Sequence, residues 1–314
     1  MKKTLVAIAA AAAVTGAFAE ATISGLLDNA ITSTTSSTTL GDGPNGGSEI
    51  TFGMSEDLGN GIKVVGAYTI IGSMTKAAGF KTYNSFVGFE GSFGSIKTGT
   101  MWNPIFLAST ISDATGRWGS TSQANPSELQ NDSSITYNSP SFSGVTVSAQ
   151  KQMSTSSSSY TGATYYNGGT GTTWLGSGAG DSTAYSVTYT GDGIQVAYAN
   201  STDTYAGDTS LVAAAVDFGV VKLHYGHKTT NFNGDTGAAT SNTNANGFGI
   251  SAPVGDSLRV SIMSSANDAT SKKTSTNFAA MYSLSNRTKF YLQSATTTTT
   301  SSTSTTLLGW RHAF

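Results

Sequence analysis

The chain has 314 residues, no cysteine, 11% charged residues and a formal net charge of −2. The lack of cysteine excludes disulfides, thiol catalysis and cysteine-based metal sites, and the slightly acidic balance excludes a generally basic nucleic-acid binder. An average domain contains about 25% charged residues, so a chain with so few charges and 37 glycines is unusual for a soluble globular protein.

Residues 1–19 predict a cleaved secretory signal peptide. Two lysines precede an apolar run over residues 5–19, which ends in the A-x-A cleavage signal AFA. The run is short for a spanning helix, so a membrane anchor or a buried helix is the less favoured alternative. Cleavage would leave residues 20–314, a single domain of 295 residues with 14 basic and 18 acidic side chains and a formal charge of −4.

Beyond residue 19 the dominant pattern is alternation with period two, which predicts β-strands rather than helices. One face of each segment carries aromatic and branched side chains, as Tyr185, Val187 and Tyr189 do. The clearest segments are 49–56, 62–71, 183–190, 194–201, 220–228 and 257–264.

The connections between these segments alternate between short turns and long loops. The short ones are rich in Gly, Asn and Asp, which is hairpin chemistry, and comprise 57–61, 91–94, 141–144, 191–193 and 284–287. The Ser/Thr/Gly tracts 32–47, 153–181, 230–245 and 296–304 are expected to be long loops. This alternation is typical of an up-and-down barrel in an outer membrane, with short periplasmic turns and long extracellular loops. We expect sixteen antiparallel strands, because about 18 residues per strand and connection accommodate the roughly 9–11 residues of a tilted spanning strand.

The charged side chains fall on the face opposite the aromatic one: Asp28, Glu49, Lys63, Glu90, Lys97, Asp217, Lys222, Arg259, Lys289 and Arg311. In a soluble sandwich this would mean only that charges face water, but no helix or second sheet is predicted to cover the apolar face. A barrel with lipid outside and water inside explains both faces. Trp310, His312 and Phe314 continue the alternation to the last residue, which predicts a terminal strand that closes the barrel and places aromatic side chains at the membrane interface.

Motifs for catalysis or metal binding are weak or missing. The stretch GDGPNG at 41–46 matches G-x-G-x-x-G, but it follows a Ser/Thr tract and opens no helix. His224 and His227 lie on opposite faces of one predicted strand, so no metal site is expected. No serine has an evident base partner. The sequence therefore predicts no catalytic residue and no cofactor.

One connection, residues 101–132, differs from the others because it is apolar. It carries Trp102, Ile105, Phe106, Leu107, Ile111 and Trp118, and a loop this long is functional or disordered. Its apolar content predicts packing against the inside of the barrel. The alternative is an external loop that covers a neighbouring subunit.

Several stretches together resemble the general porins of Gram-negative outer membranes, especially the betaproteobacterial and neisserial type. They are TISGLLDNAI, SEDLGNGIKV, NSFVGFEGSFGSIKTG, DSSITYNSPSFSGVTVS, YSLSNRTKFY and the terminal GWRHAF. The resemblance implies a sixteen-stranded homotrimer among outer-membrane lipid and lipopolysaccharide, whose third long loop narrows a lumen open to ions and small hydrophilic solutes. It also implies that Phe314 and Trp310 form a signal for the outer-membrane assembly machinery.

The resemblance also suggests a pore constriction and a departure from the family pattern. The expected constriction residues are Asp113, Arg117, Glu128 and Asp132 from the loop, facing Lys63, Lys97 and Arg259 on the wall. The family usually has arginine where this chain has Thr100, Gln130 and Thr136. We therefore expect weak selectivity, neutral to slightly cation-preferring.

The function expected from the sequence is passive diffusion through an outer-membrane porin, without a reaction. An outer-membrane barrel enzyme using His224, a substrate-specific channel and a secreted β-adhesin are the alternatives. Calcium bound in the Asp/Asn-rich loops is a further alternative.

Overall fold

The structure is a computed structural model, which describes residues 19–44, 47–75, 79–116, 124, 130–153, 182–203, 207–231, 242–269 and 272–314. All but the last residue of the expected signal peptide lies outside these ranges.

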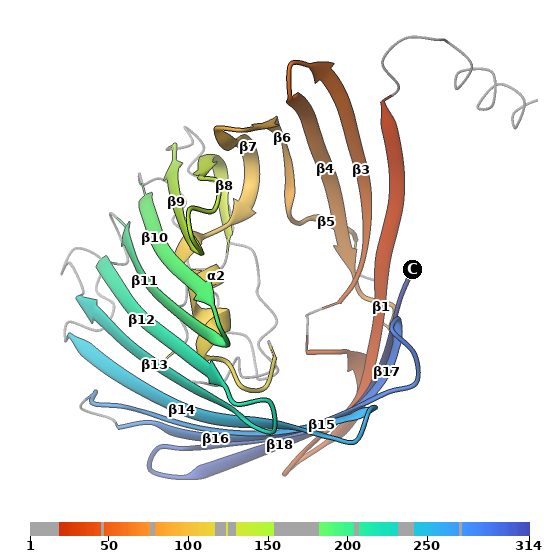
Figure 1. Cartoon of the computed structure of the whole chain (residues 1–314). Helices are drawn as coiled ribbons and strands as arrows, with labels where there is room; N and C mark the ends of the chain where they lie inside the picture. The colour runs from red at the N-terminus through yellow and green to blue at the C-terminus, as the bar shows by residue number, and fades with distance from the viewer. Residues whose placement is uncertain are drawn as a thin grey trace, which may run out of the picture.

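The described residues form one antiparallel sheet that curves into a ring (Figure 1). Its segments are β1 Glu20–Thr34, β2 Thr38–Asp42, β3 Ser48–Gly59, β4 Ile62–Gly72, β5 Lys81–Thr82, β6 Ser85–Gly91, β7 Gly94–Trp102, β8 Gln130–Asn138, β9 Val145–Gln152, β10 Ser182–Gly191, β11 Ile194–Asp203, β12 Gly207–Asp217, β13 Lys222–Asn231, β14 Thr243–Val254, β15 Leu258–Asn267, β16 Thr274–Ser283, β17 Thr288–Thr298 and β18 Ser302–Ala313. Because β2 and β3 both pair with β1, and β5 and β6 both pair with β4, the 18 segments make sixteen strands. The one helix of the described residues, α2 (Pro104–Ser112), is not long and apolar enough to cross a membrane.

The ring is closed by the first and last strands. β1 pairs with β18 from Leu26↔Ala313 to Thr34↔Thr305. The ladder continues to the last residue, since Gly25 and Phe314 exchange two backbone hydrogen bonds of 3.0 Å each. Closure leaves no sheet edge, which hydrocarbon would not tolerate. The expected sixteen-stranded barrel and its terminal closing strand are confirmed.

The two faces of the sheet are those expected from the alternation. Tyr185, Val187 and Tyr189 on β10 are exposed on the outside, whereas Ala184 and Ser186 on the other face of the same strand are buried. Trp310 and Phe314 also lie on the outer surface, 45% and 42% exposed. Apolar side chains therefore cover the outside, as lipid requires.

The short turns are confirmed at each expected position, but two of the expected long loops are wrong. Residues 296–304 lie largely in strands, with a connection of 299–301, and half of residues 32–47, namely 32–34 and 38–42, lie in strands that are joined at 35–37. β-Branched threonine favours strands, and hydroxyl pairs join the facing tracts, such as Thr296 with Ser304 at 2.9 Å and Thr298 with Ser302 at 2.9 Å. The tracts 153–181 and 230–245 fall mostly outside the described residues.

A side chain braces the closing seam from the inside. Tyr291 of β17 lies over Gly309 of β18, where an added Cβ would collide with the phenol and with the Asn29 carbonyl oxygen. The Tyr291 hydroxyl reaches past β18 and donates to Asp28 Oδ1 of β1 at 2.7 Å. One phenol therefore spans three adjacent strands at the point where the barrel closes.

We expect Gly309→Ala to lower the thermal unfolding temperature of the detergent-folded barrel. Its methyl group must displace Tyr291 or the Asn29 carbonyl, and overpacking of this kind costs about 1–3 kcal/mol. Gly41→Ala is the matched control, because an added Cβ there meets open space. Circular dichroism melts decide the matter, and equal shifts for both variants would contradict the brace.

Candidate functional site: a loop on the inner wall

The loop after β7 begins as a capped helix. Asn103 precedes α2 and its side chain accepts a hydrogen bond of 3.0 Å from the Ile105 amide, while Pro104 occupies the first helical turn. Asparagine is a preferred N-cap and proline is favoured at the first helical position. Trp102 stacks on Phe106 with ring centroids 5.0 Å apart. The sequence WNPIF thus fixes where the chain leaves the wall and starts the helix.

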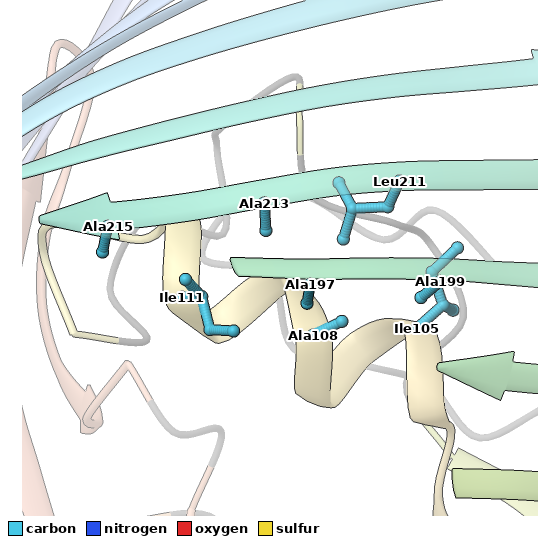
Figure 2. Packing of buried hydrophobic residues seen from close by; sticks show 8 residues of the cluster. All are labelled: Ile105, Ala108, Ile111, Ala197, Ala199, Leu211, Ala213 and Ala215. Carbon is cyan, nitrogen blue, oxygen red and sulfur yellow. The ribbon is translucent and has the colours of Figure 1, made fainter. Parts of the chain in front are cut away.

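An apolar face of α2 packs against the inner surface of β11 and β12 (Figure 2). The buried cluster comprises Ile105, Ala108 and Ile111 from the helix and Ala197, Ala199, Leu211, Ala213 and Ala215 from the wall. Alanines on the wall let the helix approach closely. Burying each isoleucine away from luminal water contributes about 1.5–3 kcal/mol. The inward packing expected for the loop is confirmed for its described part.

Four polar side chains from β9, β11, β13 and β15 tether the loop along its path. Three bind loop carbonyl oxygens and one binds the N-cap side chain. The contacts are Gln150 Nε2 to the Trp102 oxygen at 3.1 Å, Asn103 Nδ2 to Ser201 Oγ at 3.4 Å, His224 Nδ1 with the Ile111 oxygen at 2.9 Å, and Arg259 Nη2 to the Ala114 oxygen at 2.8 Å. The loop is therefore held at intervals around one side of the inner wall.

Two glycines of the wall make room for the end of the loop. A Cβ on Gly226 would lie 2.8 Å from Ser112 Oγ, and one on Gly249 would collide with the Ala114 methyl group. Gly226 lies on β13, which also carries His224, and Gly249 lies on β14, between the strands of His224 and Arg259. The space left by these glycines and the hydrogen bonds of the two tethers therefore stabilise the same end of the loop.

The charged loop residues expected to line the constriction do not form one row of charges along the pore. Asp113 is buried, and its Oδ1 accepts hydrogen bonds from the Thr115 amide at 2.8 Å and the Thr115 hydroxyl at 2.6 Å. Asp132 lies half-buried on β8. Arg117 and Glu128 lie outside the described residues.

The expected wall residues are divided between two parts of the ring. Arg259 of β15 contacts the loop, as described above, whereas Lys63 and Lys97 lie on β4 and β7. Lys97 Nζ lies 2.7 Å from Glu90 Oε1 and 4.7 Å from the centre of the Phe86 ring. Since α2 packs against β9 to β14, the structure brings Arg259 to the loop but places Lys63 and Lys97 on a different part of the wall.

A neutral network occupies the wall where the loop begins. Gln150 Nε2 donates to Thr136 Oγ1 at 2.9 Å, and Asn131 Nδ2 donates to Gln150 Oε1 at 2.8 Å. Thr136 is one of the three positions where the resemblance leads us to expect arginine. All three members of the network are buried and uncharged. The residue of β7 directly opposite Thr136 is Lys97, which is paired with Glu90.

Sequence reasoning missed the tethers and the docking surface. Gln150, Ser201 and His224 bind backbone or N-cap atoms, which leave no sequence motif. A usable signal did exist in β12, where LVAAAV at 211–216 is apolar on both faces. A strand of a water-filled barrel that is apolar inside as well as outside predicts that its inner face is covered.

Asp268, which follows β15, binds the start of β14. Its carboxylate accepts hydrogen bonds from the Asn244 amide at 2.6 Å and from Asn244 Nδ2 at 2.7 Å. These bonds hold the pKa of Asp268 below its usual range. A lowered pKa means that the contribution to stability is present above the unfolded-state pKa and disappears as the pH falls through the lowered value.

Within the described ranges, no group of three or more His, Asp or Glu side chains is placed to hold a metal ion. His224 does not face other ligands, because its Nε2 lies 3.2 Å from Ser251 Oγ while its Nδ1 faces the loop carbonyl.

A closed sixteen-stranded barrel with an apolar outside, a polar inside and an inward-folded third loop defines a transmembrane barrel of the porin class. A model of the Gram-negative porin family matches residues 4–302. The chain therefore belongs to the Gram-negative porin family, and family and fold together indicate the outer membrane.

Known relatives and structures agree with this assignment. The chain is 28% identical over 193 residues to the major outer membrane protein P.IB of Neisseria meningitidis serogroup B, and 29% over 199 residues to that of Neisseria gonorrhoeae. The chain spans about half the length of the curated relatives it matches. An anion-selective porin from Comamonas acidovorans superposes with a TM-score of 0.74 at 20% identity, covering 95% of this chain and 100% of that one. OmpF of Salmonella typhi, in complex with daunomycin, superposes with a TM-score of 0.71 at 13% identity, covering 95% and 98%.

We expect Arg259→Gln to weaken the attachment of the loop to the wall, because a hydrogen bond to a charged donor is worth about 1.5–3 kcal/mol. The open-channel current noise should then rise by roughly two-fold or more. Lys222→Gln removes the same charge from the same face, but Lys222 binds Gln195 of the wall at 2.8 Å. Single-channel recordings should show added noise in the Arg259 variant alone. Equal noise in both variants would contradict the tether.

Proposed function

We propose that the protein is a general porin, which lets ions and small hydrophilic solutes diffuse passively across the outer membrane without a reaction or a cofactor. The observation that carries the proposal is that the loop covers only one part of the inner wall, while charged side chains on another part stay accessible. α2 packs against β9 to β14, whereas on β6 and β7 the Glu90 and Lys97 side chains remain 43% and 20% accessible. Charged side chains that face the inside of a barrel and stay accessible are expected where water passes.

The assembly and cellular setting belong to the same proposal. We infer that residues 1–19 are removed on export, that residues 20–314 assemble as a homotrimer, and that the outer surface contacts lipid and lipopolysaccharide. The exposed aromatic and branched side chains on the outer face support contact with lipid. One structural neighbour, OmpT of Vibrio cholerae, is described in a trimer form.

The first test is conductance in a planar bilayer with detergent-purified protein. A water-filled trimeric pore should give stepwise current increases in threes that are ohmic at low voltage. Protein that inserts and does not conduct would favour a plugged or substrate-specific channel, and protein that never inserts would overturn the proposal.

We expect weak ion selectivity, neutral to slightly cation-preferring. The mature chain has a net charge of −4. Thr136 has only uncharged hydrogen-bond partners, Lys97 opposite it is paired with Glu90, and Arg259 is bound to the loop. Asp113, Arg117, Glu128, Asp132 and Lys63 complete the proposed constriction. The reversal potential in a salt gradient measures the selectivity, and a marked anion preference would contradict the expectation.

We expect Phe314→Ala to leave folding of the barrel intact but to impair its assembly into the outer membrane. The backbone bonds between residue 314 and Gly25 do not need the phenyl ring, so the variant should still refold in detergent. If Phe314 and Trp310 form the assembly signal, the amount of protein in the outer membrane should fall severalfold in cells. Unchanged levels in the membrane would remove Phe314 from that role.

A further inference from the structure

The helix α2 has a second face, which points away from the wall into the space that the barrel encloses. Figure 2 shows the first face, whose buried side chains pack on β11 and β12. With 3.6 residues per turn, Phe106, Leu107 and Thr110 lie on the opposite side of the helix. Leu107 is 42% exposed, Thr110 is exposed and Phe106 is half-buried. We call these three residues the luminal face of α2.

The luminal face offers passing solutes neither a charge nor a free hydroxyl hydrogen. The helix has the sequence PIFLASTIS, without a charged residue. Its three hydroxyl groups all donate to carbonyl oxygens of the helix itself. These bonds run from Ser109 to Phe106 at 2.7 Å, from Thr110 to Leu107 at 2.7 Å and from Ser112 to Ser109 at 2.8 Å. The luminal face is therefore apolar in chemistry as well as in composition.

The apolar surface continues from the helix to the wall through aromatic rings. Phe106 stacks on Trp102, the last residue of β7, with ring centroids 5.0 Å apart. Trp102 in turn meets Tyr83, which lies just before β6, edge to face at 5.1 Å. All three rings are half-buried. Leu107 thus belongs to an extended apolar surface and is not an isolated exposed leucine.

Packing of the loop does not explain why residue 107 is a leucine. The other face of α2 supplies the buried contacts with the wall, and Leu107 is too exposed to add much to them. A single exposed leucine needs no explanation, whereas a connected apolar surface usually marks a site of interaction. The closed ring of strands separates this surface from lipid. Solutes in the enclosed space are therefore what it can contact.

We propose that Leu107 and Phe106 are specificity-determining residues of the channel. They favour the passage of small organic solutes that carry an aliphatic or aromatic group over solutes of equal size and charge that lack one. This inference rests on the proposed porin function and names the class of solute that the channel prefers.

Weak apolar contact is a suitable basis for such a preference. An aliphatic group that touches Leu107 removes apolar surface of both partners from water, which is favourable. Passage requires an attraction that helps the solute to enter but is weak enough to let it leave, and a contact with one exposed side chain is small. Glu90 and Lys97 stay accessible elsewhere on the inner wall. A solute with a polar head and an apolar part therefore finds both chemistries inside the barrel.

The proposal is tested by the swelling of liposomes that contain the mature protein, in free leucine and in free asparagine. Both solutes are zwitterions of similar size, and they differ in an isobutyl against a carboxamide group. Leu107→Gln keeps a good helix former and makes the luminal face polar. We expect the leucine-to-asparagine ratio of swelling rates to fall by roughly two-fold or more. Leu284→Gln is the matched control, because Leu284 is an exposed leucine in the 284–287 turn, and it should leave the ratio unchanged.

The ratio separates specificity from pore size, since a wider or narrower pore changes both rates together. An unchanged ratio in folded Leu107→Gln protein, or an equal fall in the Leu284 variant, would overturn the proposal. If Leu107→Gln does not fold, Thr110→Leu decides instead. It enlarges the apolar luminal face and should raise the ratio by roughly 1.5-fold or more, so that an unchanged ratio would again overturn the proposal. Wild-type liposomes that swell in neither solute would overturn the proposed porin function, and the two failures are thus distinguishable.

Discussion

Backbone hydrogen bonding in hydrocarbon is the constraint on which the rest of this structure depends. No water is available there to satisfy a free strand edge, so the first and last strands must pair. The ladder between β1 and β18 runs to the terminal residue, where Phe314 and Gly25 exchange both backbone hydrogen bonds. Once the sheet is closed, every strand has one face toward lipid and one toward the enclosed space. The segregation of aromatic from charged side chains follows from that division.

Closure also determines where an apolar loop can be stabilised by burial. Outside, lipid tails are as apolar as isoleucine, so docking gains little from the hydrophobic effect. Inside, the loop can remove Ile105 and Ile111 from water by packing on the alanines of β11 and β12. Hydrogen bonds from Gln150, His224 and Arg259 then satisfy carbonyl oxygens before the helix, in its last turn and after it.

The global fold was largely predictable because each of its rules leaves a periodic trace in the sequence. Alternation gave the strands, Gly/Asn/Asp clusters gave the short turns, and the aromatic tail gave the closure. The threonine tracts are strands rather than the expected loops, since composition does not reveal hydroxyl pairs between strands such as Thr296 and Ser304.

The candidate site was less predictable than the fold, for a related reason. Its tethers end on backbone atoms, and Asp113 binds its own loop through Thr115. Neither kind of contact has a sequence signature.

The charged side chains inside the barrel are therefore best classified by the group that each of them contacts. Arg259 holds the loop, Lys222 binds Gln195, and Asp28 accepts a hydrogen bond from Tyr291 at the closing seam. Glu90 and Lys97 neutralise one another on a different part of the wall. A count of inward charges would overstate the field that a passing ion meets, because most of these groups are committed to a neighbour. In the proposed channel, the shape fixed by these contacts, rather than a free row of one sign of charge, is what sets the conditions of passage.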